Sequence, residues 1–164
     1  ASIALREGRL AEAAELLQQA ETQRPAVPGT CNGQPFDDLR DLDDLTASFF
    51  EVLTTTGKYY WVPIEQVVEI EFHPPVRPRD QFWRGARLVV RGGPDGEVFL
   101  PVLYAGSESE PDDLLRLGRS SDWRGGEGEP VRGIGRRSFL VGDQDLSIME
   151  LQNLTFNAAE TVDR

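Results

Sequence analysis

The chain has 164 residues, of which 17 are basic and 28 acidic, so its formal net charge is −11. A hydrophobic share of 39% with three Trp, three Tyr and eight Phe is typical of a folded globular protein and excludes a disordered one. The negative charge repels nucleic-acid phosphates and anionic lipid, so we expect no nucleic acid and no membrane among its partners. The single cysteine, Cys31, cannot form an internal disulfide, which favours a cytoplasmic location.

The first predicted element is an amphipathic helix in "LREGRLAEAAELLQQAETQRP". Gly8 and Arg9 separate a short helical stub from a helix over residues 10–22, which Pro25 ends. The spacing of its apolar residues resembles half of a tetratricopeptide-type hairpin, and one such unit cannot bury its own apolar face. We therefore interpret residues 1–24 as the end of a tetratricopeptide-like region whose remainder precedes Ala1. A lone helix packed on the next domain is the alternative.

Residues 25–45 read as a linker that ends in an acidic turn, "DDLRDLDDL". A calcium loop needs acids or amides at its first, third and fifth positions and Gly at the sixth. Counted from Asp41, the fifth position is Leu45 and the sixth is Thr46, so the pattern fails. We expect these carboxylates to be solvated.

From residue 46 the periodicity changes from helical to two. "SFFEVLTT" and "KYYWVPI" are β-branched and aromatic runs on either side of Thr56-Gly57, which predicts a hairpin. "QVVEIEF" follows as an alternating strand that places Val68, Ile70 and Phe72 on one face. A second hairpin is predicted where "ARLVVRG" and "EVFLPVLY" flank the turn "GPDG".

The remaining elements are a turn of helix in "RDQFWRG", a short capped helix in "SESEPDDLLRLGRS", and strands in "SFLVG" and "SIMELQNLTF". Between them, "DWRGGEGEPVRGIGRR" reads as a mobile glycine-rich surface loop, and residues 158–164 as a disordered tail. The predicted fold class is α+β. It comprises the helical tetratricopeptide-like segment followed by a mostly antiparallel, barrel-like sheet domain with short helices over residues 46–157.

Few residues suggest catalysis. His73 is the only histidine, and a metal site needs about three or four ligands, so we expect no metal and no cofactor. No G-x-S-x-G or phosphate-binding glycine motif is present. The glutamates of the alternating strand are typical of a solvated face. A small enzyme that uses His73 or a carboxylate pair within residues 65–80 remains the alternative function, with no catalytic residue assigned.

Aromatic and arginine side chains are concentrated between residues 59 and 91, and these types are enriched at the energetic centres of protein interfaces. Such a surface needs no catalytic group, so a binding module is the favoured function. The candidate partner-binding residues are Tyr60, Trp61, Arg77, Arg79, Phe82, Trp83 and Arg84.

The segment "TGKYYWVPIEQVVEIEFHPPVRPRDQFWRGARLVVRGGPDGEVFLPVLYAGS" resembles the TagJ/ImpE (SciE-type) family, and the likeness extends over most of the chain, from Arg6 to Leu154. These are accessory proteins of bacterial type VI secretion systems. The resemblance implies a helical tetratricopeptide-like region before an α+β domain, and a non-enzymatic adaptor. It further implies two partners: the small subunit of the contractile sheath, and the AAA+ ATPase that recycles the sheath.

Overall fold

The structure is a computed structural model and describes residues 1–157. The predicted tail, residues 158–164, lies outside the described residues. The helical elements are α1 (Ser2–Arg6), α2 (Leu10–Gln23), η1 (Ile64–Gln66), η2 (Pro78–Gln81), η3 (Ser107–Ser109) and α3 (Asp113–Arg116). The strands are β1 (Gly29–Cys31), β2 (Gln34–Phe36), β3 (Leu39–Asp41), β4 (Phe49–Thr54), β5 (Tyr59–Pro63), β6 (Val67–Phe72), β7 (Trp83–Val90), β8 (Asp95–Pro101), β9 (Ser121–Gly126), β10 (Glu129–Gly135), β11 (Ser138–Val141), β12 (Gln144–Ser147) and β13 (Asn153–Phe156).

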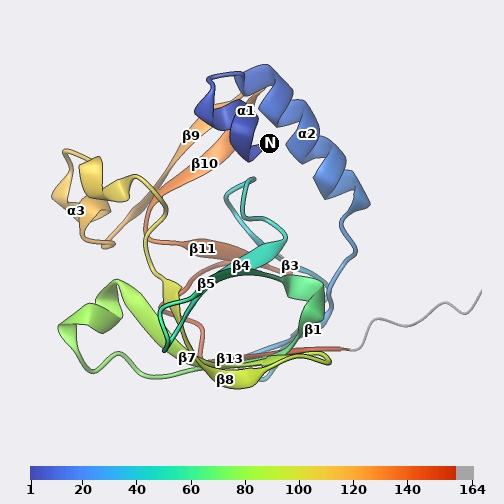
Figure 1. Cartoon of the computed structure of the whole chain (residues 1–164), viewed down its shortest axis with the longest axis vertical. Helices are drawn as coiled ribbons and strands as arrows, with labels where there is room; N and C mark the ends of the chain where they lie inside the picture. Colours follow the sequence, from blue (N-terminus) through green and yellow to red (C-terminus); the bar gives the residue numbers. More distant parts are fainter. Residues whose placement is uncertain (158–164) are drawn as a thin grey trace, which may run out of the picture.

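One eight-stranded sheet dominates the molecule, with the strand order β2-β1-β13-β6-β7-β8-β4-β5. All of its pairings are antiparallel, and it curls strongly around its buried side (Figure 1). That side carries the core, in which Phe50 and Ile70 are almost fully buried. Phe139 of β11 packs against Phe50 with the ring centroids 5.6 Å apart, so the three-stranded sheet β12-β11-β3 closes over the same core.

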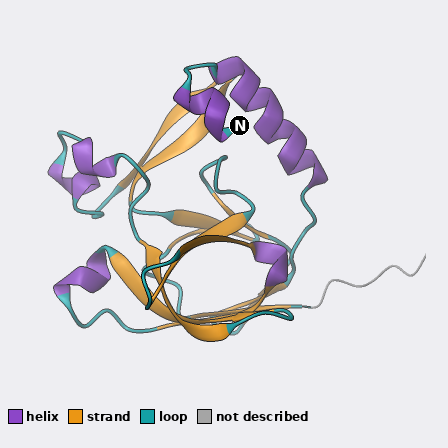
Figure 2. Cartoon of the chain, in the orientation of Figure 1, coloured by secondary structure: helices purple, strands orange, loops and turns teal. Residues whose placement is uncertain are grey.

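The predicted barrel-like α+β domain is wrong in two respects. The curled sheet ends at β2 and β5, and within residues 1–157 these two edges are not paired with each other, so the sheet is not a closed barrel. Strands predominate over three short α-helices in the described part (Figure 2). The protein is therefore mostly antiparallel β.

The N-terminal segment is not a tetratricopeptide-like region. The boundary at Gly8 and the helix from residue 10 are confirmed, but the helices have only 5 and 14 residues. Of the residues of α2, Ala13 alone is fully buried. Figure 1 shows α1 and α2 at the tip of the β9–β10 hairpin, where α2 contacts β10 before it leads away from the hairpin. The apolar spacing of residues 10–22 therefore belongs to a short helix that packs on the β9–β10 hairpin. Among residues 1–157, no helix has the length and apolar character that crossing a membrane requires.

Two other segments are more ordered than we expected. Residues 29–41 hold three strands, and Cys31 pairs with Leu154 inside the main sheet. The glycine-rich segment is the hairpin β9–β10, in which Ile134 is buried. Gly125 and Gly135 adopt positive φ angles, and a Cβ on either would lie about 2 Å from a backbone oxygen. These glycines therefore let backbones approach closely, and they do not mark a mobile loop.

The two hairpins predicted around residues 56–57 and 93–96 are confirmed as β4–β5 and β7–β8. In β6, Ile70 and Phe72 share one face as predicted, and this face is buried, but Val68 is exposed and Val67 takes the buried place. A register shift between Val67 and Glu69 explains the difference, because one extra residue reverses the alternation.

Candidate protein-interaction surface

Strand β5 is an exposed edge of the main sheet and carries three consecutive aromatic residues. It pairs with β4 on one side, and in the described part of the chain no strand pairs with its other side. Tyr59, Tyr60 and Trp61 keep 51%, 48% and 48% of their surface exposed. Natural edge strands usually carry charges or prolines that prevent pairing, but here only Pro63 at the end of the strand has that effect. An aromatic edge of this kind is typical of a binding surface.

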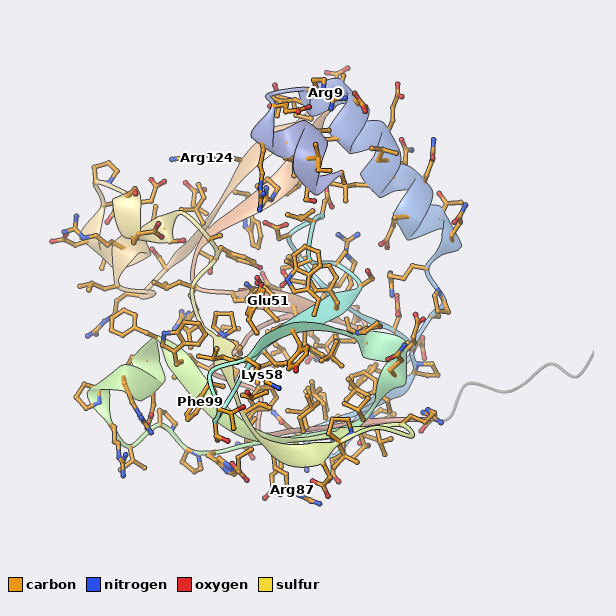
Figure 3. The ribbon with its side chains drawn as sticks, in the orientation of Figure 1. Arg9, Glu51, Lys58, Arg87, Phe99 and Arg124 are labelled. Atoms are coloured by element: carbon orange, nitrogen blue, oxygen red, sulfur yellow. The ribbon has the colours of Figure 1, made fainter. Side chains whose placement is uncertain are left out.

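The strand register extends these aromatics into a larger patch on the outer side of the sheet. Tyr59 lies opposite Leu53, and Leu53 lies opposite Phe99 of β8. In the next row, Trp61 stacks on Phe49 with ring centroids 4.1 Å apart and 14° between the planes. We call the side chains of Phe49, Leu53, Tyr59, Trp61 and Phe99 the outer aromatic face; Phe99 is labelled in Figure 3.

Hydrogen bonds fix the two rings of β5 that lie on the outer side of the sheet. The indole Nε1 of Trp61 donates to the Tyr59 hydroxyl at 2.7 Å, and that hydroxyl donates to the carboxylate of Glu51. Partial burial and the bond to Glu51 raise the pKa of Tyr59 to about 12, so its hydroxyl keeps its proton at neutral pH. The rings are therefore held in one arrangement before any partner arrives.

Arg79 and Arg77 lie on the proline-rich turn that borders this face. The carboxylate of Asp80 accepts hydrogen bonds from the backbone N–H groups of Val76 (2.9 Å) and Arg77 (2.8 Å). These bonds lower the pKa of Asp80. The guanidinium of Arg79 lies over the ring of Phe99, 5.3 Å from its centroid. The turn is thus rigid and presents both arginines to solvent.

The other sequence-predicted residues divide between the two sides of the sheet. Trp83 begins β7 on the outer side, opposite Pro101, and Phe82 precedes it; both are partly exposed. Tyr60 points to the opposite side from its neighbours in β5 because side chains alternate along a strand. The structure therefore places Trp61, Arg79 and Trp83 on one side of the sheet and Tyr60 on the other.

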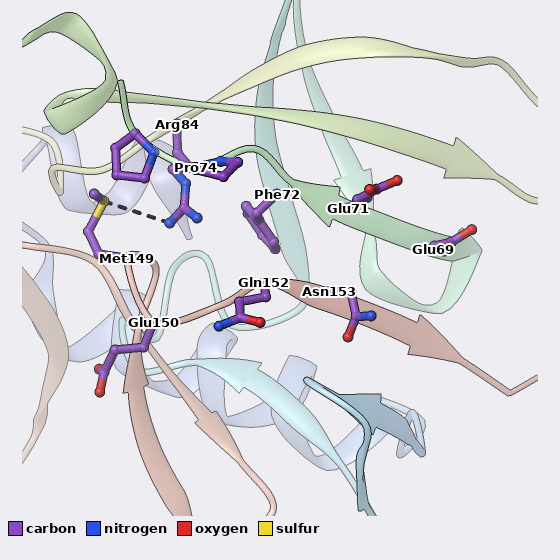
Figure 4. A pocket seen from close by; sticks show the side chains of 10 residues that line it. Glu69, Glu71, Phe72, Pro74, Arg84, Met149, Glu150, Gln152 and Asn153 are labelled. Atoms are coloured by element: carbon purple, nitrogen blue, oxygen red, sulfur yellow. Dashed lines mark hydrogen bonds between the residues drawn. The ribbon is translucent and has the colours of Figure 1, made fainter. Parts of the chain in front are cut away.

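Arg84 is not a surface residue, because only 3% of it is exposed. Its guanidinium donates to the backbone carbonyls of His73, Ile148 and Leu151, at 2.8, 3.0 and 3.2 Å. Figure 4 shows it in the wall of a hollow of about 940 Å³, close to Met149. Arg84 therefore fastens the turn before β13 to the end of β6, and we remove it from the candidate surface.

Sequence reasoning missed a buried ionic network that adjoins the outer aromatic face through Glu51. Asp41, which is fully buried, accepts hydrogen bonds from Arg137 (2.6 Å) and from the Tyr104 hydroxyl (2.7 Å). Arg137 also pairs with Glu51. Burial alone would lower the pKa of the Arg137 guanidinium, but the charges of Asp41 and Glu51 outweigh it and raise that pKa.

Asp43 is part of the same region and accepts from Arg132 and from the backbone N–H of Gly133. The expectation that the acids of residues 37–45 are solvated is therefore wrong for Asp41 and Asp43. The signals available in the sequence were the alternation of Leu39, Asp41 and Asp43 and the adjacent arginines Arg136 and Arg137. A single sequence does not indicate which acid meets which arginine.

The groups of the alternative enzymatic function are exposed or unreactive. His73 lies on the outer side with its Nε2 2.6 Å from the Glu97 carboxylate, and both side chains are about half exposed. Cys31 is buried, and burial raises the pKa of its thiol, which disfavours the reactive thiolate. Glu69 and Glu71 project side by side at the rim of the hollow in Figure 4. Within residues 1–157, no three His, Cys, Asp or Glu side chains gather as a metal site.

The fold and this surface define a class of protein: a mostly antiparallel β domain with an aromatic, preformed edge. The family model described as ImpE protein matches residues 33–155, and the chain belongs to the ImpE family. The predicted resemblance is thereby confirmed.

Two relatives extend this assignment. The type VI secretion system accessory component TagJ of Pseudomonas aeruginosa PAO1 is 32% identical over 154 residues, which cover 94% of this chain and 53% of that protein. The crystal structure of protein VPA1032 from Vibrio parahaemolyticus is 30% identical with a TM-score of 0.83, covering 92% of this chain and 56% of that one. The chain thus spans about half the length of each.

Proposed function

We propose that this protein is a non-enzymatic accessory component of a bacterial type VI secretion system that acts in the cytoplasm as an adaptor. Its proposed partner is the small subunit of the contractile sheath, with the sheath-recycling AAA+ ATPase as a second partner. Membership of the ImpE family and 32% identity to TagJ support the accessory role. The single observation that carries the proposed binding surface is the half-exposed aromatic edge strand β5.

The chemistry of this face suits a protein partner. Tyr and Trp offer large apolar areas with few rotatable bonds, so they lose little entropy when a partner covers them. Trp61 and Tyr59 are already held by hydrogen bonds, and Arg79 stands at the border of the same patch. An apolar centre bordered by an arginine is the composition found at energetic hot spots.

Calorimetric titration of the chain with the purified sheath small subunit tests the proposal. Trp61→Ala removes a half-exposed ring of the outer aromatic face, and loss of a hot-spot side chain costs about 2 kcal/mol, so affinity should fall roughly thirtyfold. Leu114→Ala is the matched control, because Leu114 is an exposed apolar residue on α3 (57% exposed) and lies outside this face. Its affinity should equal that of the unmodified chain.

Both variants are first checked for an unchanged unfolding transition. Equal affinities of the two variants would remove the outer aromatic face as the binding site. No binding by the unmodified chain, together with binding by a full-length family member, would assign the partner site to the part of the family that this chain does not span.

The alternative function, an enzyme that uses His73 or a carboxylate pair within residues 65–80, is supported by the His73–Glu97 pair alone. A carboxylate beside an imidazole can orient it as a general base. Turnover of a hydrolase substrate panel that disappears in His73→Ala, with sheath-subunit binding unchanged, would favour this alternative over the adaptor.

A further inference from the structure

A continuous line of polar contacts connects the exposed edge to the centre of the molecule. It begins at the indole of Trp61, passes through the hydroxyl of Tyr59 to the carboxylate of Glu51, and continues through Arg137 to Asp41. Every step joins two side chains. The two ends differ sharply in exposure: Trp61 is half exposed, whereas Asp41 is fully buried.

Glu51 is the junction of this line. One of its carboxylate oxygens, Oε1, accepts from Tyr59, and the other, Oε2, accepts from Arg137. The register of β4 and β5 places Glu51 opposite Trp61, on the same side of the sheet as Tyr59. Its side chain is 17% exposed, and the residue is labelled at the centre of Figure 3.

The inner end of the line is held from several directions. Arg137 donates to Asp41, Glu51 and the backbone carbonyl of Pro101, and its guanidinium lies 4.9 Å from the centre of the Tyr104 ring. A guanidinium is planar with its donors in fixed directions, so these partners fix its orientation. The orientation of Arg137 in turn limits where the Glu51 carboxylate can lie.

We propose that Glu51 is a positioning residue that holds Tyr59 and Trp61 in their orientation at the edge of the sheet by anchoring them to Arg137. The ring arrangement of the outer aromatic face is then set by the buried network, and a partner meets it already formed. The effect of Glu51 on partner binding rests on the function proposed above, whereas its positioning of Tyr59 and Trp61 does not depend on that function.

A merely structural Glu51 would behave differently from a positioning one. A structural residue would neutralise Arg137 and contribute to stability, while Trp61 would keep its order from stacking on Phe49 alone. A positioning residue controls the order of the Trp61 ring even where the fold is intact. The readout must therefore report on the ring of Trp61 and not on global stability.

The test is nuclear magnetic resonance relaxation of the indole N–H groups in the isotope-labelled chain. The chain has three tryptophans, and Trp61→Phe assigns the signal of Trp61. In Glu51→Ala, the Trp61 indole is expected to shift and become more mobile, whereas the Trp83 indole is unchanged. In Glu51→Gln, which keeps an acceptor for Tyr59, the change is expected to be smaller.

Tyr59→Phe provides a second route if Glu51→Ala fails to fold, because it leaves the pair of Glu51 and Arg137 in place. It removes the acceptor of the Trp61 indole, and the same gain in mobility is expected. An unchanged, ordered Trp61 indole in a folded Glu51→Ala or Tyr59→Phe chain would overturn the proposal.

A binding measurement separates this proposal from the proposed function. If Trp61→Ala weakens binding of the sheath small subunit, Glu51→Ala should weaken it about tenfold, since a looser ring must be ordered on binding. Unchanged affinity in that case would contradict the proposal. If Trp61→Ala leaves binding unchanged, the proposed binding site fails, and the relaxation experiment alone decides the role of Glu51.

Discussion

Asp41→Asn is expected to be strongly destabilising, although it changes only one buried oxygen to nitrogen. The substitution removes the negative charge that faces Arg137 and Tyr104, and both Asp41 and Arg137 are almost fully buried. Removing one member of a buried ion pair costs about 3–5 kcal/mol, because the remaining charge stays without compensation. Glu51 still faces Arg137, so we expect a loss near the lower end, about 3 kcal/mol. A domain is stable by only about 5–15 kcal/mol, so this loss is large.

Urea unfolding with linear extrapolation measures this loss. Asp95→Asn is the matched control, since Asp95 pairs with Arg87 at 2.5 Å but both side chains are nearly half exposed. Exposed pairs contribute about 0–1 kcal/mol, so the control should be nearly neutral. If Asp41→Asn cost no more than Asp95→Asn, the network would not carry the stabilising role assigned to it.

Three further predictions concern other parts of the chain. Gly133→Ala should destabilise the chain by about 1–3 kcal/mol in the same urea assay, because the added Cβ would lie 2.3 Å from the Tyr104 ring. Gly96→Ala is the control and should be neutral, because a Cβ at Gly96 meets open space. Equal effects of the two variants would contradict the close packing of Gly133 on Tyr104. The pKa of Asp80 is lowered in the folded chain, so the stabilisation of its turn is present above the ordinary carboxyl pKa of about 4 and is lost as the pH falls through the lower folded value. An acid titration of the turn's amide signals should show this loss, and the same titration in Asp80→Ala should be flat. Cys31 should react with a thiol reagent only as fast as the chain opens, and rapid reaction of the native protein would contradict its burial.

Local elements were predictable because their signals are local. Thr56-Gly57 and the "GPDG" turn fix the positions of two hairpins through turn chemistry, and alternation placed Ile70 and Phe72 on one face. The helix over residues 10–22 was predicted to within a residue at each end, since Gly8 and Pro25 delimit it.

Long-range features could not be predicted from one sequence. Asp41 and Arg137 are 96 positions apart, and a solvated acidic turn has the same local pattern as a buried acidic strand end. The apolar spacing of the first helices does not distinguish a helical repeat from a helix that covers a hairpin. For the candidate surface, the aromatic content of residues 59–61 was informative, but the burial of Arg84 depends on carbonyls that lie 11 to 67 positions away.

Titration of the isotope-labelled chain with the unlabelled sheath small subunit, followed by amide and indole signals, maps the proposed contact on the outer aromatic face. We predict that the Trp61 indole and the amides of β4 and β5 shift and saturate together, while those of α3 do not move. Saturable shifts confined to α1, α2 or the β9–β10 hairpin would contradict the proposed contact.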